Sequence, residues 1–225
     1  MPAAAPRRLP VVVLLSGHGS NFAALAAEAA RRDYQIRGVV SDRPAAPGLE
    51  RARALGLPAE AVPFAGFPDR DAHDAALAAR IDALAPGLVV LAGYMRILSP
   101  RFVARYAGRL LNIHPSLLPK YPGLHTHRRA LEAGDAEHGA TVHFVTDQLD
   151  GGPPVAQARV PVLPGDTAET LSARVQAVEH RLYPAVVGWF ARGRLACRDG
   201  AAWLDGRRLD GPVRLEDTDE ADRAV

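Results

Sequence analysis

Cysteine is almost absent from this chain. Cys197 is the one cysteine in 225 residues, so no disulfide can form within the chain and a reducing compartment is expected. Long apolar runs are also lacking, since no window approaches the ~20 apolar residues that a membrane span needs. The apolar stretch from Val11 to Leu15 is shorter than the ~7–15 residues of a signal-peptide core. We therefore expect a cytoplasmic protein with no membrane partner.

An excess of charge of one sign is lacking as well. The formal net charge is +2, and the arginines are spread along the chain instead of forming a block. Nucleic-acid-binding proteins carry clustered basic residues, so we expect no nucleic-acid partner. Hydrophobic residues make up 48% of the chain and charged residues 23%, which is ordinary for a globular core and surface.

Apolar segments alternate with helical segments along the first half of the chain. The apolar runs predict buried strands over residues 10–15, 36–40, 59–63, 88–92 and 110–113. Amphipathic patterns between them predict helices over residues 21–32, 48–55, 69–84 and 100–106. This alternation is typical of a parallel sheet with helices on its faces.

The second half has a different pattern. Strands are predicted over residues 140–145 and 155–162, followed by a long helix from about residue 167 to 188. Asp166 is the expected N-cap of that helix, and Pro184 is expected to interrupt it. A terminal hairpin over residues 195–204 turns at Asp199-Gly200.

These elements fit one large domain. We predict a single-domain, Rossmann-like α/β fold over residues 10–208, with a mostly parallel central sheet flanked by helices and an antiparallel C-terminal portion. Residues 1–9 are expected to be a flexible lead-in, and residues 209–225 an acidic, disordered tail.

The loop that follows the strand 110–113 carries the strongest sign of chemistry. It reads Asn112-Ile113-His114-Pro115-Ser116-Leu117-Leu118-Pro119, a rigid polar loop where open α/β sheets bind ligands. Asn112 and His114 are two residues apart, so on an extended strand they point to the same side. The amide can donate a hydrogen bond, and the imidazole can titrate near neutral pH. Asp150 lies in a Gly-rich bend after the next strand, which makes the three a candidate acid–base site.

The segment Ser16-Gly17-His18-Gly19-Ser20-Asn21 is a candidate anion site. Glycines between a strand and a helix let backbone N–H groups approach an anion, and the helix dipole favours negative charge. Phe22 stands where the third glycine of a dinucleotide fingerprint belongs, and no Walker lysine follows. A tight strand–helix turn would explain the same residues, but we favour the binding of a monophosphate.

Two further features allow two interpretations each. Arg70 lies in the first turn of a helix, where a cation opposes the dipole, so it is either a solvated surface residue or has another task. The segment from Gly93 to Leu98 is an unusually apolar loop, which is either core or the wall of a pocket for a flat ligand.

Metal binding and covalent catalysis are not expected. The histidines His114, His125, His127, His138 and His143 lie close together in the sequence, but no cysteine or carboxylate stands at a familiar ligand spacing. Ser116 is not part of a nucleophile elbow. Cys197 has no activating pattern around it.

The motifs together resemble one family. The segment from Asn112 to Pro119, with Leu149-Asp150-Gly151-Gly152 downstream, resembles the 10-formyltetrahydrofolate-dependent formyltransferases. Segments 120–127, 16–21, 93–98 and 201–206 are similar to the members of that family that formylate 5-phosphoribosylglycinamide (GAR) in purine biosynthesis. The resemblance implies nucleotide binding in the N-terminal half, and folate binding and catalysis in the C-terminal half.

The resemblance also implies a role for each matching residue. Asn112, His114 and Asp150 would be catalytic. GAR would contact Gly19, Ser20, Asn21, Gln176 and Glu179; the folate would contact Arg70, Met95, Arg96, Ile97, Leu98 and Asn112; and His125 would be a further active-site residue. The co-substrate would be 10-formyltetrahydrofolate, no metal would be needed, and the enzyme would be a monomer or homodimer.

The implied reaction is attack of a primary amine on the formyl carbon through a tetrahedral oxyanion. Asn112 would donate to the oxyanion, a contribution of ~10²–10³ in rate, and His114 would stabilise the same charge or relay a proton. Asp150 would either stabilise the charged imidazole or hold a water.

Three competing functions share part of this pattern. Methionyl-tRNA formyltransferase is the nearest, but it would need an RNA-binding domain and a basic surface. Formyltetrahydrofolate deformylase, in which water replaces the amine, usually has an N-terminal regulatory domain, for which residues 1–9 are too short. A catalytically idle binding module would have no need of Asn112, His114 and Asp150 together.

Overall fold

The computed structural model describes residues 8–215, which form a mixed α/β structure with two sheets. The strands of the large sheet are β1 (Leu9–Leu15), β2 (Tyr34–Ser41), β3 (Ala59–Ala61), β4 (Leu88–Leu91), β5 (Leu110–His114), β6 (Glu137–Phe144), β7 (Pro154–Pro161) and β11 (Val213–Arg214). The helices are α1 (Ser20–Glu28), α2 (Pro47–Ala54), α3 (Arg70–Ala83), α4 (Pro100–Arg105), α5 (Thr126–Glu132) and α6 (Ala168–Ala191). The small antiparallel sheet contains β8 (Leu195–Arg198), β9 (Ala201–Leu204) and β10 (Arg207–Arg208).

The large sheet has the order β11-β7-β6-β5-β4-β1-β2-β3. All pairs from β5 to β3 are parallel, whereas β6 is antiparallel to both of its neighbours. The predicted class, a mostly parallel central sheet with an antiparallel C-terminal portion, is confirmed.

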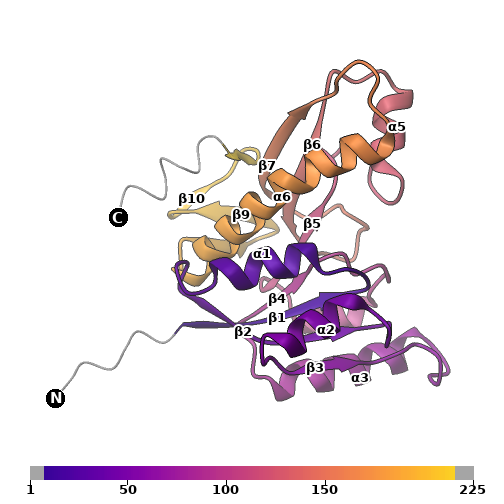
Figure 1. Ribbon diagram of the computed structural model, residues 1–225. Helices are drawn as coiled ribbons and strands as arrows, with labels where there is room; N and C mark the ends of the chain where they lie inside the picture. The colour runs from indigo at the N-terminus through magenta and orange to yellow at the C-terminus, as the bar shows by residue number, and fades with distance from the viewer. Residues whose placement is uncertain (1–7, 216–225) are drawn as a thin grey trace.

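Alternation along the buried strands explains how helices cover both faces. On β1, Val11, Val13 and Leu15 pack into one apolar cluster with α1, α2 and α6, while Val12 and Leu14 pack into another with α3 and α4. Successive side chains of a strand point to opposite faces, so a continuous apolar run requires both faces to be covered. Figure 1 shows α6 as a long orange helix beside α1, with α3 at the bottom of the view.

The strand order reverses between β1 and β4. From β1 the chain continues through β2 and β3 on one side, then returns to build β4 and β5 on the other. In open α/β sheets, ligands bind at the carboxyl ends of the strands beside such a switch point. The loops that follow β1, β4 and β5 therefore meet at one edge of the sheet.

The long helix differs from its prediction in two ways. Thr167, not Asp166, is the N-cap, and it forms a capping box with Thr170. Asp166 instead accepts from Arg174 and from the backbone N–H of Leu163. The helix also continues through Pro184 to Ala191, because that part of α6 is buried in the core and packing outweighs the hydrogen bond that proline removes.

The ends of the predicted domain also differ. Leu9 of the expected lead-in already belongs to β1, and residues 1–7 lie outside the described residues. Residues 213–214 of the expected tail pair with β7 as β11, and Leu215 is buried. The prediction of a disordered tail that starts at residue 209 is therefore wrong for residues 213–215. Residues 216–225 lie outside the described residues. In residues 8–215, no helix is long and apolar enough to cross a membrane.

Candidate active site

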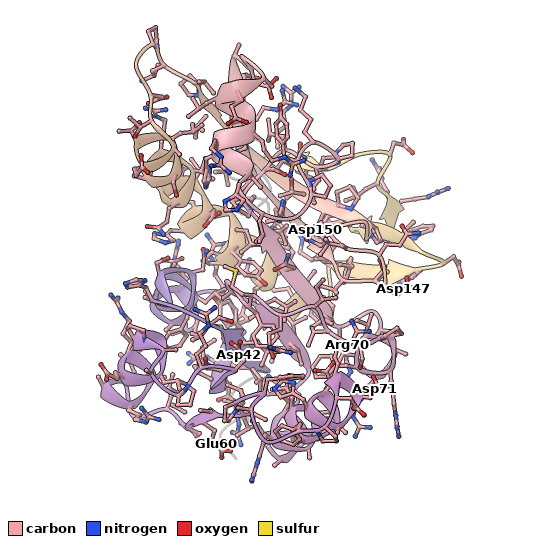
Figure 2. The ribbon with its side chains drawn as sticks, turned by 90° about the vertical axis from the view of Figure 1, so that its right-hand side faces the viewer. Asp42, Glu60, Arg70, Asp71, Asp147 and Asp150 are labelled. Atoms are coloured by element: carbon pink, nitrogen blue, oxygen red, sulfur yellow. The ribbon has the colours of Figure 1, made fainter. Side chains whose placement is uncertain are left out.

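A cleft of about 790 Å³ lies at the switch point, between the loops that follow β1, β4 and β5. Ligand pockets for small molecules commonly measure about 300–1,000 Å³, so the cleft has the size of a small-molecule site. Asp150 lies beside β5 in Figure 2, with Asp42 lower in the view and Asp147 toward the right. The three predicted catalytic residues, Asn112, His114 and Asp150, all line this cleft.

His114 ends β5 and is almost completely buried. Its Nε2 lies 2.9 Å from the carbonyl oxygen of Tyr121. A carbonyl oxygen can only accept, so Nε2 carries a proton and Nδ1 is the nitrogen that can exchange one. Nδ1 lies 3.4 Å from Oδ2 of Asp150, close enough for an ion pair when the ring is protonated.

Asp150 is held in place by its backbone and by one further hydrogen bond. Its φ of 51° is left-handed, a conformation that aspartate and asparagine tolerate better than most residues. The backbone N–H of Gly123 donates to Oδ2 of Asp150 at 2.8 Å. The carboxylate therefore cannot turn away from the imidazole without losing this bond.

His143 on β6 orients the amide of Asn112. Antiparallel pairing places Asn112 opposite His143, and Nδ2 of Asn112 lies 3.2 Å from Nε2 of His143. Nδ1 of His143 donates to the carbonyl of Phe144, so its Nε2 is the acceptor and Asn112 is the donor. Burial lowers the pKa of His143, which favours this neutral form. The second N–H of the Asn112 amide is left for a ligand.

Thr141, also on β6, fixes the loop that follows His114. Its Oγ1 donates to the carbonyl of Ser116 at 2.7 Å and accepts from the backbone N–H of Leu118 at 3.0 Å. Ser116 is fully buried and donates to the carbonyl of Lys120. Ser116 thus holds the loop through its hydroxyl group.

The candidate anion site also lines the cleft. Gly19 precedes α1 with a φ of 73°, and a Cβ added there would lie 2.9 Å from Cα of Gly48. Only glycine combines this backbone conformation with such a close approach. The first N–H groups of α1 have no partner within the helix, which is the arrangement that binds anions.

Gln176 and Glu179 of α6 meet this loop, as predicted for a shared substrate site. Nε2 of Gln176 donates to Oγ of Ser20 at 3.0 Å, and Nδ2 of Asn21 donates to Oε2 of Glu179 at 2.8 Å. Burial raises the pKa of Glu179. The structure therefore brings the five residues predicted to contact GAR together, through hydrogen bonds between residues 156 and 158 positions apart in the sequence.

The loop that follows β4 forms an apolar wall of the cleft. Met95 and Ile97 are 60% and 59% exposed, although both line the cleft. Oγ of Ser16 accepts from the backbone N–H of Met95 and donates to Asp42, which ties this wall to β1. Apolar side chains in a cleft are suited to a flat ring system.

Arg70 and His125 differ in their placement. Arg70 is exposed at the start of α3 and does not line the cleft in the described part of the chain. In Figure 2, Arg70 lies to the right of the centre of the view, lower than Asp147. His125 lines the cleft with a left-handed φ of 59°, directly before α5.

The remaining histidines do not form a metal cluster. His127 and His138 face each other with Nδ1 and Nε2 3.1 Å apart. Burial lowers the pKa of both rings, that of His138 to about 4. Across residues 8–215, no group of three or more histidine, cysteine, aspartate or glutamate side chains could hold a metal ion.

The roles of His143, Thr141 and Ser16 are not apparent from sequence patterns. The alternation of Thr141 and His143 along β6 indicates a strand, but it does not identify the partner strand. The roles become clear only from the antiparallel pairing of β6 with β5. This pairing places Asn112 opposite His143 and His114 opposite Thr141.

Comparison with known proteins identifies a family for this chain. The family model "Formyl transferase" matches residues 9–187, a span that contains every residue predicted for the site. The phosphoribosylglycinamide formyltransferase of Escherichia coli K12 is 57% identical over 201 residues, which cover 88% of this chain and 95% of that protein. The human trifunctional purine biosynthetic protein adenosine-3 is 40% identical over 189 residues, 83% of this chain and 19% of that protein. The solved structure of the phosphoribosylglycinamide formyltransferase of Coxiella burnetii has a TM-score of 0.88 at 48% identity, and covers 92% of this chain and 99% of that one.

Proposed function

The chain belongs to the formyl transferase family, and from that premise we propose that it formylates the primary amine of GAR, with 10-formyltetrahydrofolate as donor, in purine biosynthesis. The observation that carries the proposal is that Asn112, His114 and Asp150 line the same cleft as the candidate anion loop and the apolar wall. The proposal also includes that the protein is cytoplasmic and is a monomer or a homodimer.

Two parts of the cleft lining suit the two substrates. The phosphate of GAR would bind the loop of Gly19, Ser20 and Asn21, where the N-terminus of α1 supplies N–H donors. Gln176 and Glu179 would contact the rest of GAR. The folate ring would lie on the apolar wall from Met95 to Leu98, and His125 would complete the site.

Asn112 would stabilise the negative oxygen that develops when the amine adds to the formyl carbon. One N–H of its amide is engaged by His143, so the other is held in a fixed direction before substrate arrives. A preorganised donor of this kind typically contributes about 10²–10³ in rate. Orientation by His143 is what makes the donor preorganised.

His114 and Asp150 would move the protons. Protonated at Nδ1, His114 stabilises the oxyanion and delivers a proton to the departing folate nitrogen. Asp150 stabilises the charged ring and takes up the proton that the attacking amine loses. The protein thus gives up one proton at His114 and takes up one at Asp150, so its net charge is unchanged. No covalent bond to the protein forms.

A turnover assay tests the proposal. Purified protein is mixed with 10-formyltetrahydrofolate, with and without GAR, and release of tetrahydrofolate is followed. Release that requires GAR supports the proposal. Release without GAR would mean that water is the acceptor, and formylation of methionyl-tRNA alone would mean a different acceptor.

A further inference from the structure

A buried pair of side chains, His73 and Asp74, lies behind the apolar wall of the cleft, and the proposed chemistry makes no use of it. His73 has no exposed surface and Asp74 is 4% exposed. Nε2 of His73 lies 2.9 Å from the carbonyl oxygen of Val62, and Nδ1 lies 3.1 Å from Oδ1 of Asp74. Because the carbonyl only accepts, Nε2 carries a proton, and the second nitrogen faces a carboxylate.

Asp74 also holds the end of the cleft wall. Its Oδ2 accepts from the backbone N–H of Ser99 at 2.6 Å. Ser99 is itself buried and caps α4 by accepting from Phe102. One carboxylate oxygen of Asp74 thus meets His73 and the other meets Ser99, so the side chain cannot turn without losing one of the two contacts.

The side chains around His73 hold the middle of the same wall. The guanidinium of Arg96 lies 3.8 Å above the ring of Phe64. Phe64 and Phe67 pack against His73 with ring centroids 5.5 and 5.4 Å away. Two contacts of the segment around this wall with the α3 side of the molecule therefore pass through His73 or Asp74.

We propose that the His73–Asp74 pair is a positioning element that sets the wall of the cleft against the formyl donor. The inference rests on the proposed function, because it takes the apolar wall as the donor's side of the cleft. Neither residue lines the cleft, so the pair acts on the donor only through Arg96 and the segment that Ser99 ends. Loosening the wall should weaken donor binding and leave the phosphate loop unchanged.

Steady-state kinetics separates this role from a general structural one. Asp74→Ala removes the acceptor of Ser99 and the carboxylate that faces His73, and we expect the KM for 10-formyltetrahydrofolate to rise about tenfold, since an unordered wall must be ordered on binding. The KM for GAR and kcat should stay within about threefold. Asp74→Asn keeps an oxygen that accepts from Ser99 and an amide that can pair with Nδ1 of His73, and should restore the donor KM.

Controls make each outcome decisive. Asp71→Asn, an exposed site in the first turn of α3, removes the same charge and should change nothing. If Asp74→Ala does not fold, His73→Gln, which can still donate to Val62, should raise the donor KM in the same direction. Equal rises in both KM values, or a fall in kcat alone with unchanged donor KM, would overturn the proposal.

Calorimetric titration with tetrahydrofolate separates the inference from the proposed function. If the wild-type protein binds tetrahydrofolate but does not formylate GAR, the proposed function fails, while the variants still report on the wall. Weaker binding by Asp74→Ala than by Asp74→Asn supports the positioning role. Equal binding by both, or no binding by the wild-type protein, contradicts it.

Discussion

Replacement of Asp150 by asparagine should abolish most of the transfer while the fold persists. Asparagine has the same shape, tolerates the left-handed φ of 51°, and can still accept from the N–H of Gly123. The free energy of unfolding should therefore change by less than about 1 kcal/mol. The substitution removes the charge that faces His114 and the carboxylate that would take up the proton of the attacking amine.

The distance between the two groups limits the effect on rate. Unit charges separated by 3.4 Å, the distance between Nδ1 of His114 and Oδ2 of Asp150, interact by about 5 kcal/mol at an effective dielectric constant of 20. Part of that energy is offset by the cost of desolvating both groups, so we expect kcat to fall about 10²–10³-fold.

The assay is kcat for formylation of GAR at saturating donor, together with urea unfolding of the same preparation. Asp199→Asn is the matched control, because Asp199 is exposed, has a left-handed φ of 50° and does not line the cleft. A folded Asp150→Asn enzyme with kcat within threefold of the wild type would refute the ion-pair reasoning.

Four further outcomes follow from the structure. His143→Leu should lower kcat by about 10-fold or more and leave the KM for GAR unchanged, because Asn112 loses the acceptor that orients its amide; an unchanged kcat would contradict this role. Gly19→Ala should raise the KM for GAR by at least about tenfold, since φ is 73° and the new Cβ would lie 2.9 Å from a backbone atom; a free phosphate titration provides a second readout. Thr141→Val should destabilise the protein by about 1–3 kcal/mol in urea unfolding, because buried partners of its hydroxyl group lose their hydrogen bonds. Burial lowers the pKa of His138 from 6.5 to about 4, so the unfolded chain binds the proton first as the pH falls. The free energy of unfolding should therefore be highest above pH 6.5 and should decrease between pH 6.5 and 4, by on the order of 3 kcal/mol. Urea unfolding as a function of pH measures this decrease, which should be smaller in His138→Gln.

Much of the fold follows from local patterns in the sequence. The apolar run of β1 predicts a strand covered on both faces, and both of its faces are covered. The hairpin turn at Asp199-Gly200 also lies where its composition predicts. Such features depend on neighbouring residues alone, so they can be read without knowledge of the rest of the molecule.

Features that depend on distant partners could not be predicted. β11 is two residues long and exists because the edge of β7 offers hydrogen bonds. The continuation of α6 through Pro184 depends on packing against the sheet. The role of His143 depends on antiparallel register with β5, which neither strand specifies alone.

The site is predictable to the extent that its residues fall in short motifs. Loop composition points to Asn112, His114 and Asp150, and the structure places them in one cleft. Resemblance points to Arg70, but this residue lies outside the lining of that cleft in the described residues. A single residue on a helix carries no local sign of which cleft it approaches.

A single-turnover experiment with a ¹³C-labelled formyl donor tests the central claim, direct transfer within this cleft, most directly. Excess enzyme, labelled 10-formyltetrahydrofolate and GAR are mixed, and the label is followed in the small molecules and in the intact protein. We predict that the label passes from donor to formylated GAR without appearing on the protein. Labelled protein as an intermediate, or labelled formate as the main product, would contradict the account.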